Sequence, residues 1–242
     1  MDLFRHAAKS RRTGQPLAER MRPRDLDEVA GLPEVTGPAS FLRKAIAEDR
    51  VPSLVFWGPP GSGKTTLARI IARSTRARFV AFSAVVSGIK EIKAVMEEAQ
   101  RARRSGGKTL LFVDEIHRFN RAQQDAFLPY VESGAIVLVG ATTENPSFEL
   151  NGALLSRLRV VILPPLSLAD LEGIVDRAAE GERGLGGKVR LEPEARAWLA
   201  RFADGDARRA LTALEAAARH AGPEAEITVP LLTDLLGRKL LL

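Results

Sequence analysis

One segment of the sequence has the residue types and the spacing that bind nucleotide phosphates. An apolar run ends in a turn of the pattern G-x-x-x-x-G-K-T, which consists of Gly58, Pro59, Pro60, Gly61, Ser62, Gly63, Lys64, Thr65 and Thr66. Glycines in such a turn let successive backbone N–H groups converge on one anion, which also lies at the positive end of the following helix. The segment therefore predicts a nucleoside triphosphate site.

Two side chains of this loop have specific predicted roles. Lys64 can reach the β- and γ-phosphates, and the Thr65 hydroxyl suits the octahedral oxygen coordination of Mg²⁺. The sequence around the loop supports this interpretation, because an apolar run precedes it and Leu67, Ile70 and Ile71 follow on one helical face. A chance glycine-rich turn would lack this strand-loop-helix context.

A second apolar segment, Thr109–Val113, ends in two adjacent carboxylates, Asp114 and Glu115. In a parallel sheet the carboxyl ends of the strands share one edge, so both side chains are expected beside the phosphate loop. There Asp114 can hold Mg²⁺, through water or through its hydroxyl ligand, and Glu115 can polarise the water that attacks the γ-phosphate. Such a pair alone is common and usually structural, but together with the loop it predicts hydrolysis.

The elements that must position these residues follow an alternating pattern. Short apolar runs predict parallel strands buried on both faces, at Ser53–Trp57, Arg78–Ser83, Thr109–Val113 and Ala135–Ala141. Amphipathic helices are expected before and between them, at Gly37–Asp49, Thr65–Ser74, Ile89–Arg103 and Arg121–Glu132. This alternation predicts an α/β fold, a doubly wound parallel sheet with the phosphate loop at the strand ends.

After Pro164 and Pro165 the pattern changes to amphipathic helices with few strand signals. These helices are expected at Ser167–Glu180, Glu192–Ala203, Asp206–Ala221 and Val229–Leu236. The sequence therefore predicts three regions: a flexible basic arm over residues 1–20, an ATPase domain over residues 21–165, and a small all-helical lid domain over residues 166–242.

Composition excludes several classes of protein. The chain of 242 residues has no cysteine, which excludes disulfides, thiol catalysis and Cys-ligated zinc. The net charge of +6 is compatible with a polyanionic partner such as nucleic acid, or with a solvated arginine-rich surface alone. No apolar run approaches the ~20 residues of a membrane span and no signal peptide is visible, so we expect a cytoplasmic protein without a membrane partner.

Longer strings resemble the AAA+ ATPases and, within them, the replication-associated recombination protein A family, which is related to the Werner-helicase-interacting protein of eukaryotes. The strings cover residues 16–23, 114–120, 123–129 and 140–151, and the resemblance runs from about Pro16 to the C-terminus. It implies DNA-dependent hydrolysis of ATP with Mg²⁺ at stalled replication forks and in recombination. It also implies a nucleoid-associated location, DNA junctions or primer ends as partners, and single-strand-binding protein or the sliding clamp as further candidates.

The resemblance also implies roles for three residues outside the phosphate loop. Thr143 corresponds to the sensor 1 position, with Asn145 as the second choice, and the alternative for Thr143 is a capping threonine. Arg157 corresponds to the arginine finger that reaches a neighbouring subunit's nucleotide, and the alternative is an ordinary surface arginine. Arg208 corresponds to sensor 2, which reaches the γ-phosphate from the helical lid domain.

Four further segments have a less specific resemblance. Residues 21–31 resemble the segment that packs on adenine, although Leu32 stands where the family commonly has glutamine. Lys90 and Lys93 share one helix face and can meet a DNA backbone, or simply face solvent. The arginines of residues 101–104 are expected only to stabilise a helix C-terminus. Residues 1–4, Met-Asp-Leu-Phe, resemble a short clamp-binding peptide.

Two other functions compete with this prediction. A Holliday-junction branch-migration motor shares several strings, but that family carries a hairpin between Asp114 and Thr143, where this chain has room for only a helix and a strand. A non-hydrolytic clamp-loader subunit tends to lose residues such as Lys64, Glu115 or Arg157, all of which are present. Family members also continue into a C-terminal domain that supports tetramers. We therefore expect a fragment or a short relative, largely monomeric at micromolar concentration and with weak basal ATPase activity.

Overall fold

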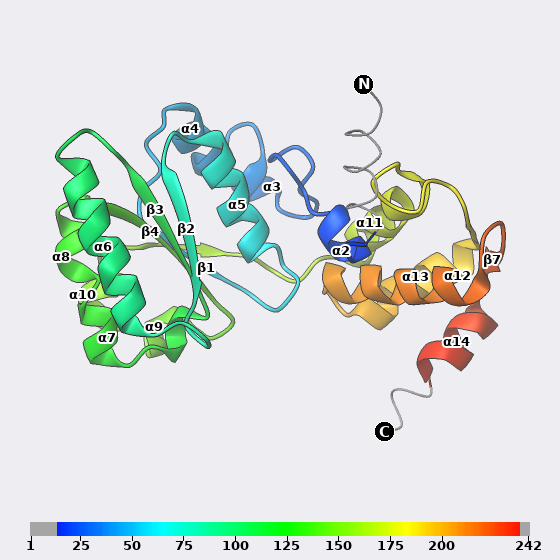
Figure 1. The fold of residues 1–242 in the computed structure, drawn as a ribbon. Helices are drawn as coiled ribbons and strands as arrows, with labels where there is room; N and C mark the ends of the chain where they lie inside the picture. Colours follow the sequence, from blue (N-terminus) through cyan, green and yellow to red (C-terminus); the bar gives the residue numbers. More distant parts are fainter. Residues whose placement is uncertain (1–13, 238–242) are drawn as a thin grey trace. The chain divides into compact units, whose positions relative to one another are not determined.

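The computed structural model describes residues 14–237, which form two compact units (Figure 1). The larger unit contains residues 23–164, and the smaller one combines residues 14–22 with residues 165–237. The candidate clamp peptide, residues 1–4, lies outside the described residues. In the part of the chain that is described, no helix is long and apolar enough to cross a membrane.

A five-stranded parallel sheet forms the centre of the larger unit. Its strands are β1 (Leu54–Trp57), β2 (Arg78–Ser83), β3 (Thr109–Asp114), β4 (Ile136–Thr142) and β5 (Arg159–Ile162). Their spatial order is β2-β3-β4-β1-β5. Strand β4 therefore lies between β1, which precedes the phosphate loop, and β3, which ends at the carboxylate pair.

Helices cover both faces of this sheet (Figure 1). They are α3 (Pro33–Thr36), α4 (Phe41–Ala47), α5 (Lys64–Ser74), α6 (Ile89–Arg103), the 3-10 helix η1 (Ile116–Arg118), α7 (Arg121–Asp125), α8 (Leu128–Glu132), α9 (Pro146–Glu149) and α10 (Gly152–Leu155). Alternate strand residues point to opposite faces, so Leu54 and Phe56 of β1 pack with α5, whereas Val55 packs with α6. The doubly wound α/β fold predicted from the sequence is confirmed.

Three details of this unit differ from the expectation. Strand β2 is not buried on both faces, because it lies at the edge of the sheet and all its residues are partly or fully exposed. Strand β5 was not expected, since its apolar run is short and three of its four residues are exposed at the other edge. The helix expected at Arg121–Glu132 is two helices, because Pro129 lacks an N–H and is suited to the first turn of a new one.

Two ion pairs attach peripheral elements to the sheet edge. Arg78 Nη1 of β2 lies 2.6 Å from Glu98 Oε1 of α6, and its hydrogen bond lowers the pKa of Glu98. Lys108 Nζ, just before β3, lies 2.6 Å from Asp49 Oδ2, and this hydrogen bond is the main cause of the lowered pKa of Asp49. Both pairs are exposed, so each contributes little to stability.

The smaller unit is mainly helical. It consists of α2 (Leu17–Arg20), α11 (Leu168–Glu180), α12 (Pro193–Ala203), α13 (Ala207–Ala221) and α14 (Val229–Gly237), with two short strands, β6 (Arg190–Leu191) and β7 (Glu226–Ile227). The two strands pair in parallel, so the unit is not entirely helical as predicted. Ser167 and Asp206 cap α11 and α13, as the sequence indicates.

The expected arm over residues 1–20 is wrong for its described part. Leu17 of α2 is fully buried in an apolar cluster with Leu171 and Leu214. Arg20 adds a hydrogen bond of 2.8 Å from Nη1 to the carbonyl oxygen of Gly184. Residues 14–22 therefore complete the core of the smaller unit, because a single buried leucine outweighs the local polarity of the segment.

Candidate active site

The phosphate loop connects β1 to α5 through a backbone that only glycine can adopt at several positions. A Cβ atom on Gly58 would lie 2.1 Å from the carbonyl oxygen of Leu163, so no larger residue fits there. Gly61 and Gly63 have φ values of 73° and 97°, in the left-handed region that L-residues avoid. These glycines turn the chain directly into α5, whose N-terminus is the positive end of the helix dipole.

The loop fits a phosphate group. The side chain of Ser62 is buried, and its Oγ has no hydrogen-bond partner among the described residues. A Cβ atom built on Gly63 would meet nothing within 4 Å, so the surface beside the helix N-terminus is open. Lys64 is 8% exposed, and its Nζ donates hydrogen bonds of 2.7 and 2.8 Å to the carbonyl oxygens of Gly58 and Pro59. A buried ammonium, the unpaired Ser62 hydroxyl and the positive end of the helix dipole together suit an anion.

The sheet brings the loop and the carboxylates to one edge. Trp57 of β1 is in register with Thr142 of β4, and the N–H of Gly58 donates a hydrogen bond of 3.2 Å to the carbonyl oxygen of Thr142. On the other side of β4, β3 ends at Asp114. The three strand ends are therefore adjacent, as expected for a phosphate-binding edge.

Glu115 has an unusual backbone conformation directly after β3. Its φ is 54°, which is strained for a residue with a Cβ atom and which turns the chain sharply into η1. The Asp114 side chain accepts a hydrogen bond of 3.2 Å from the Glu115 N–H. Both carboxylates are partly exposed at the sheet edge, where solvent and a ligand can reach them.

Thr142, which the sequence analysis did not single out, occupies the end of β4. Its side chain is fully buried, and its Oγ1 lies 2.9 Å from Nδ1 of His117 and accepts from the N–H of Glu144 at 3.0 Å. Thr143 is the next residue and is half-buried, so its role as sensor 1 stays a prediction. The side chain of Asn145 is engaged in capping α9, because its Oδ1 accepts from the Ser147 N–H at 3.0 Å.

Comparison of the sequence with protein-family models assigns the chain to a known group. The family described as "ATPase family associated with various cellular activities (AAA)" matches residues 54–166, and the AAA C-terminal domain matches residues 185–242. The chain belongs to the AAA family of ATPases. The prediction that this chain is an ATPase that binds nucleotide is therefore confirmed.

Individual relatives show which AAA proteins this chain resembles in sequence. Replication-associated recombination protein A of Escherichia coli is 51% identical over 205 residues, which are 84% of this chain and 46% of that protein. ATPase WRNIP1 of Dictyostelium discoideum is 45% identical over 84% of this chain and 23% of that protein. The resemblance found in the sequence is confirmed, and the chain spans about half the length of the bacterial relative.

The solved structures include a Holliday junction branch migration motor, RuvB of Thermotoga maritima. It superimposes with a TM-score of 0.73 and 27% identity over 90% of this chain and 73% of that chain. Between β3 and β4, the AAA chain contains only η1, α7 and α8. This segment therefore has no strand pair between the two strands that carry the candidate catalytic residues.

Arg157, the candidate arginine finger, follows α10 at the surface of the AAA domain. Its Nη2 lies 2.5 Å from Glu132 Oε1 at the end of α8, and its Nη1 donates to the carbonyl oxygen of Ala153 at 2.6 Å. More than a third of its side chain is exposed. The structure does not bring it into the group formed by the loop and Glu115, so its role stays a prediction that concerns a neighbouring chain.

A buried glutamine that the sequence analysis did not single out fixes the segment before Arg157. Gln124 of α7 donates to the carbonyl oxygens of Phe119 and Glu149 at 2.8 and 3.0 Å. Its Oε1 accepts from the N–H of Asn151 at 2.7 Å, and Asn151 caps α10. In the sequence, residues 123–129 draw attention to Gln124 only because they resemble the family. A glutamine by itself does not indicate this structural role.

Arg208, the candidate sensor 2, belongs to the smaller unit. It lies in the first turn of α13, which Asp206 caps by accepting from the N–H groups of Arg208 and Arg209 at 2.8 and 3.1 Å. The side chain of Arg208 is exposed, whereas the Arg209 guanidinium lies 4.4 Å from the ring centre of Phe202. Arg208 is therefore the arginine of this turn that is available to a ligand, and its contact with a phosphate stays a prediction.

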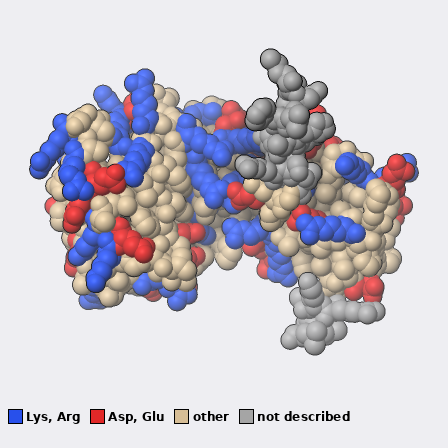
Figure 2. Space-filling model, viewed as in Figure 1, with Lys and Arg blue, Asp and Glu red and all other residues tan. Residues whose placement is uncertain are grey.

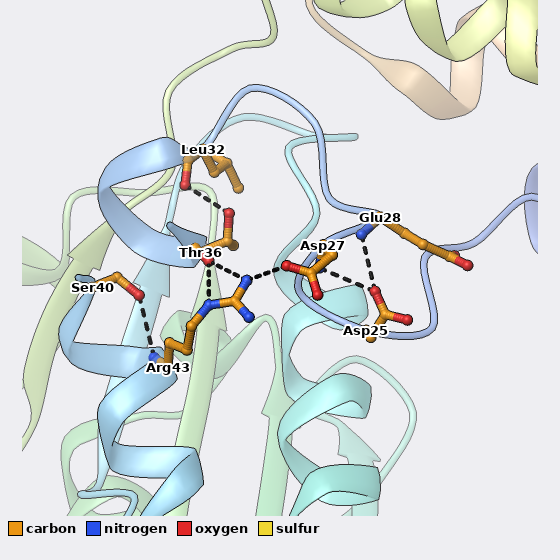
Figure 3. Close-up of polar contacts among 7 residues, drawn as sticks. All are labelled: Asp25, Asp27, Glu28, Leu32, Thr36, Ser40 and Arg43. Carbon is orange, nitrogen blue, oxygen red and sulfur yellow. Dashed lines mark hydrogen bonds and ion pairs between the residues drawn. The ribbon is translucent and has the colours of Figure 1, made fainter. Parts of the chain in front are cut away.

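The segment expected to pack on adenine contains a hydrogen-bonded turn that Arg43 contacts (Figure 3). Arg43 of α4 donates two hydrogen bonds to the carbonyl oxygen of Thr36 and one of 2.6 Å to Asp27. The side chain of Leu32 is buried in the core between the sheet and α5, and its carbonyl oxygen accepts from the Thr36 hydroxyl. Leucine at this position thus supports packing, and any polar contact with a base must come from other groups.

Proposed function

We propose that this chain hydrolyses ATP with Mg²⁺ and couples hydrolysis to work on DNA in replication-fork rescue and recombination. The observation that supports hydrolysis best is the placement of Glu115 at the same sheet edge as the phosphate loop, with β4 between them. Nucleotide binding needs only the loop, whereas a carboxylate beside it provides a base for the attacking water.

Each residue then has a distinct task. The N–H groups of Gly61, Ser62 and Gly63 and the Lys64 ammonium bind the β- and γ-phosphates and balance their negative charge. The Thr65 hydroxyl and the Asp114 carboxylate offer the hard oxygen ligands that Mg²⁺ prefers, and the metal would neutralise charge on the transferred group. Glu115 accepts a proton from the attacking water as the bond from the γ-phosphorus to the bridging oxygen breaks. ADP and inorganic phosphate are the products.

The link to DNA rests on the relatives and on charge. The bacterial relative is named for replication and recombination, and the chain carries a net charge of +6. Figure 2 shows Lys and Arg side chains over both units, with acidic side chains among them. We infer that DNA junctions or primer ends are the substrate, that single-strand-binding protein or the clamp recruits the protein, and that it acts in the cytoplasm at the nucleoid.

A branch-migration motor is the second candidate, because of the similarity to RuvB. The helical connection between β3 and β4 argues against it, since that motor carries a hairpin there. If this chain alone, with ATP, moves the branch point of a synthetic four-way junction, the result favours the motor over the proposed function.

The test is ATP turnover with and without primer-ended DNA, for the wild type and for Glu115→Gln. We expect DNA to stimulate the wild type, and the substitution to lower kcat by about 100-fold or more while ATP binding persists. Glu149→Gln, which changes an exposed carboxylate in α9, serves as the matched control and should turn over normally. Wild-type turnover in Glu115→Gln would refute the assignment of the base.

A further inference from the structure

A histidine connects the end of β4 to the candidate base. The imidazole of His117 is only 9% exposed, and its Nδ1 lies 2.9 Å from Thr142 Oγ1 and 3.4 Å from Glu115 Oε2. These three side chains come from η1, from β4 and from the turn after β3, and they meet only because β3 and β4 are paired. A histidine needed merely to fill space would not require a polar partner on either side.

The hydrogen bonds of Thr142 indicate which proton His117 carries. The hydroxyl has one proton and two lone pairs. One lone pair accepts from the N–H of Glu144, and the hydroxyl proton can go to the Glu144 carbonyl oxygen at 3.2 Å. The second lone pair then accepts from Nδ1–H of His117. The opposite assignment would point an imidazole lone pair at the carboxylate of Glu115, which is electrostatically unfavourable.

We propose that His117 is a positioning residue for hydrolysis: its imidazole, anchored through Nδ1–H on the Thr142 hydroxyl, lies against the Glu115 carboxylate and keeps it in the place from which it takes a proton from water. This inference rests on the proposed function, in which Glu115 is the base. His117 itself touches neither nucleotide nor water in this role and acts only through Glu115.

The anchor also connects the base to the phosphate loop. The carbonyl oxygen of Thr142 accepts from the N–H of Gly58, the first residue of the loop, and the next residue is Thr143. The same threonine thus contacts the loop through its backbone and His117 through its hydroxyl. A shift of the loop or of Thr143 therefore moves Thr142, and with it the His117 imidazole that faces Glu115.

Two substitutions of His117 separate positioning from packing. In His117→Asn the amide can place an N–H donor where Nδ1 lies, whereas in His117→Gln the amide reaches instead the position of Nε2. We expect kcat to fall about tenfold or more in His117→Gln and to stay within about threefold of wild type in His117→Asn, because misplacing a catalytic group by about 1 Å is costly. KM and the affinity for a fluorescent ATP analogue should be unchanged in both.

Thr142→Val and Thr142→Ser give an independent test that leaves the ring in place. Removal of the hydroxyl should lower kcat as in His117→Gln, and serine should restore it, since serine keeps an oxygen at the same position. Thermal unfolding and analogue binding identify any variant that fails to fold. Equal kcat losses in His117→Asn and His117→Gln, with serine at position 142 failing to rescue, would overturn the proposal.

The Glu115→Gln background distinguishes failure of this inference from failure of the proposed function. If His117 acts through Glu115, His117→Gln should cause no further loss of kcat once the carboxylate is absent. A full additional loss in that background would refute positioning while leaving Glu115 as the base. Unchanged turnover in Glu115→Gln alone would instead refute the proposed function.

Discussion

At the scale of single residues, the phosphate loop contains glycines that are required for two different reasons. Gly58 is surrounded by backbone, and a Cβ atom there would meet the Leu163 carbonyl oxygen at 2.1 Å. Gly63 has open space around it but a φ of 97°, which L-residues rarely adopt. One position is thus limited by packing and the other by conformation, so alanine should affect them differently.

We predict that Gly58→Ala lowers stability and that Gly63→Ala lowers ATP affinity. Alanine at position 58 forces the phosphate loop away from the Leu163 backbone, which lowers the free energy of unfolding by on the order of 1–3 kcal/mol. Alanine at 63 can relax locally in the free protein, but adopting the binding conformation then costs about 1–2 kcal/mol, or roughly 5- to 30-fold in affinity. Chemical denaturation and titration with a non-hydrolysable ATP analogue measure the two effects. Equal stability loss in both variants with unchanged affinity would contradict this distinction.

The site residues that the sequence indicates most directly are those whose signal is local. The loop from Gly58 to Thr66 and the pair Asp114-Glu115 are contiguous, so their spacing alone indicates their chemistry. His117 and Thr142 are 25 positions apart and meet only through the pairing of β3 with β4. Neither residue type is distinctive, so only the folded sheet reveals that they share a hydrogen bond.

At the scale of elements, the sequence indicates those that have a long apolar run or a helical period, including the exposed edge strand β2. Helix α6 was predicted with its observed bounds because its buried face, Ile92, Met96 and Ala99, repeats at helical spacing. Strand β5 has a single buried residue, Val161, so no burial pattern marks it, and it pairs only with β1. Strand β5 therefore depends on β1 for its structure, and the sequence around β5 does not encode that neighbour.

The two ends of α6 allow a test of DNA contact. Lys90 and Lys93 are exposed in its first turns, close to the exposed apolar pair Val85 and Val86 that follows β2. We predict that Lys90→Ala with Lys93→Ala weakens DNA binding and reduces the slope of log affinity against log salt by up to about 2, because each lysine neutralises one phosphate. Fluorescence anisotropy with a primer-ended duplex at several salt concentrations measures this slope.

The control removes the same charge from the other end of the helix. Arg101→Ala with Arg104→Ala leaves the first turns of α6 intact and should retain most of the affinity and the wild-type salt slope. If both double variants lose affinity equally, net charge alone explains binding and α6 presents no specific contact.

At the scale of the whole chain, two segments that are far apart in the sequence belong to one unit. Leu17 and the helices after Pro165 share a core, although the whole sheet unit, residues 23–164, separates them in the sequence. The prediction of a separate arm failed because a four-residue helix with one buried leucine has no periodic signal. Two prolines and a change of pattern underlie the boundary predicted between residues 165 and 166, and the two compact units divide one residue earlier, between Pro164 and Pro165.

The position of Arg157 raises the question whether the active site is complete within one chain. Arg157 is exposed and pairs with Glu132 on the surface, away from the loop of its own sheet. If it serves a neighbouring chain, ATPase activity per chain should rise with protein concentration, and Arg157→Ala should abolish that rise. An arginine finger contributes about 10³–10⁵ in rate where one has been measured, so even a small associated fraction should be visible. Turnover from one to several hundred micromolar protein, with light scattering in parallel, measures this.

Mixing two inactive variants makes this test specific. Arg157→Ala keeps Glu115, and Glu115→Gln keeps Arg157, so a mixed pair contains one complete site if the arginine acts between chains. We expect the mixture to exceed the average of the two variants at concentrations where light scattering detects association, and to equal it where the chains are monomeric. Glu132→Gln releases Arg157 from its surface partner without removing it, so this variant should keep wild-type turnover. A mixture that never exceeds the average, at concentrations where association is seen, would mean that Arg157 acts within its own chain or has no catalytic role.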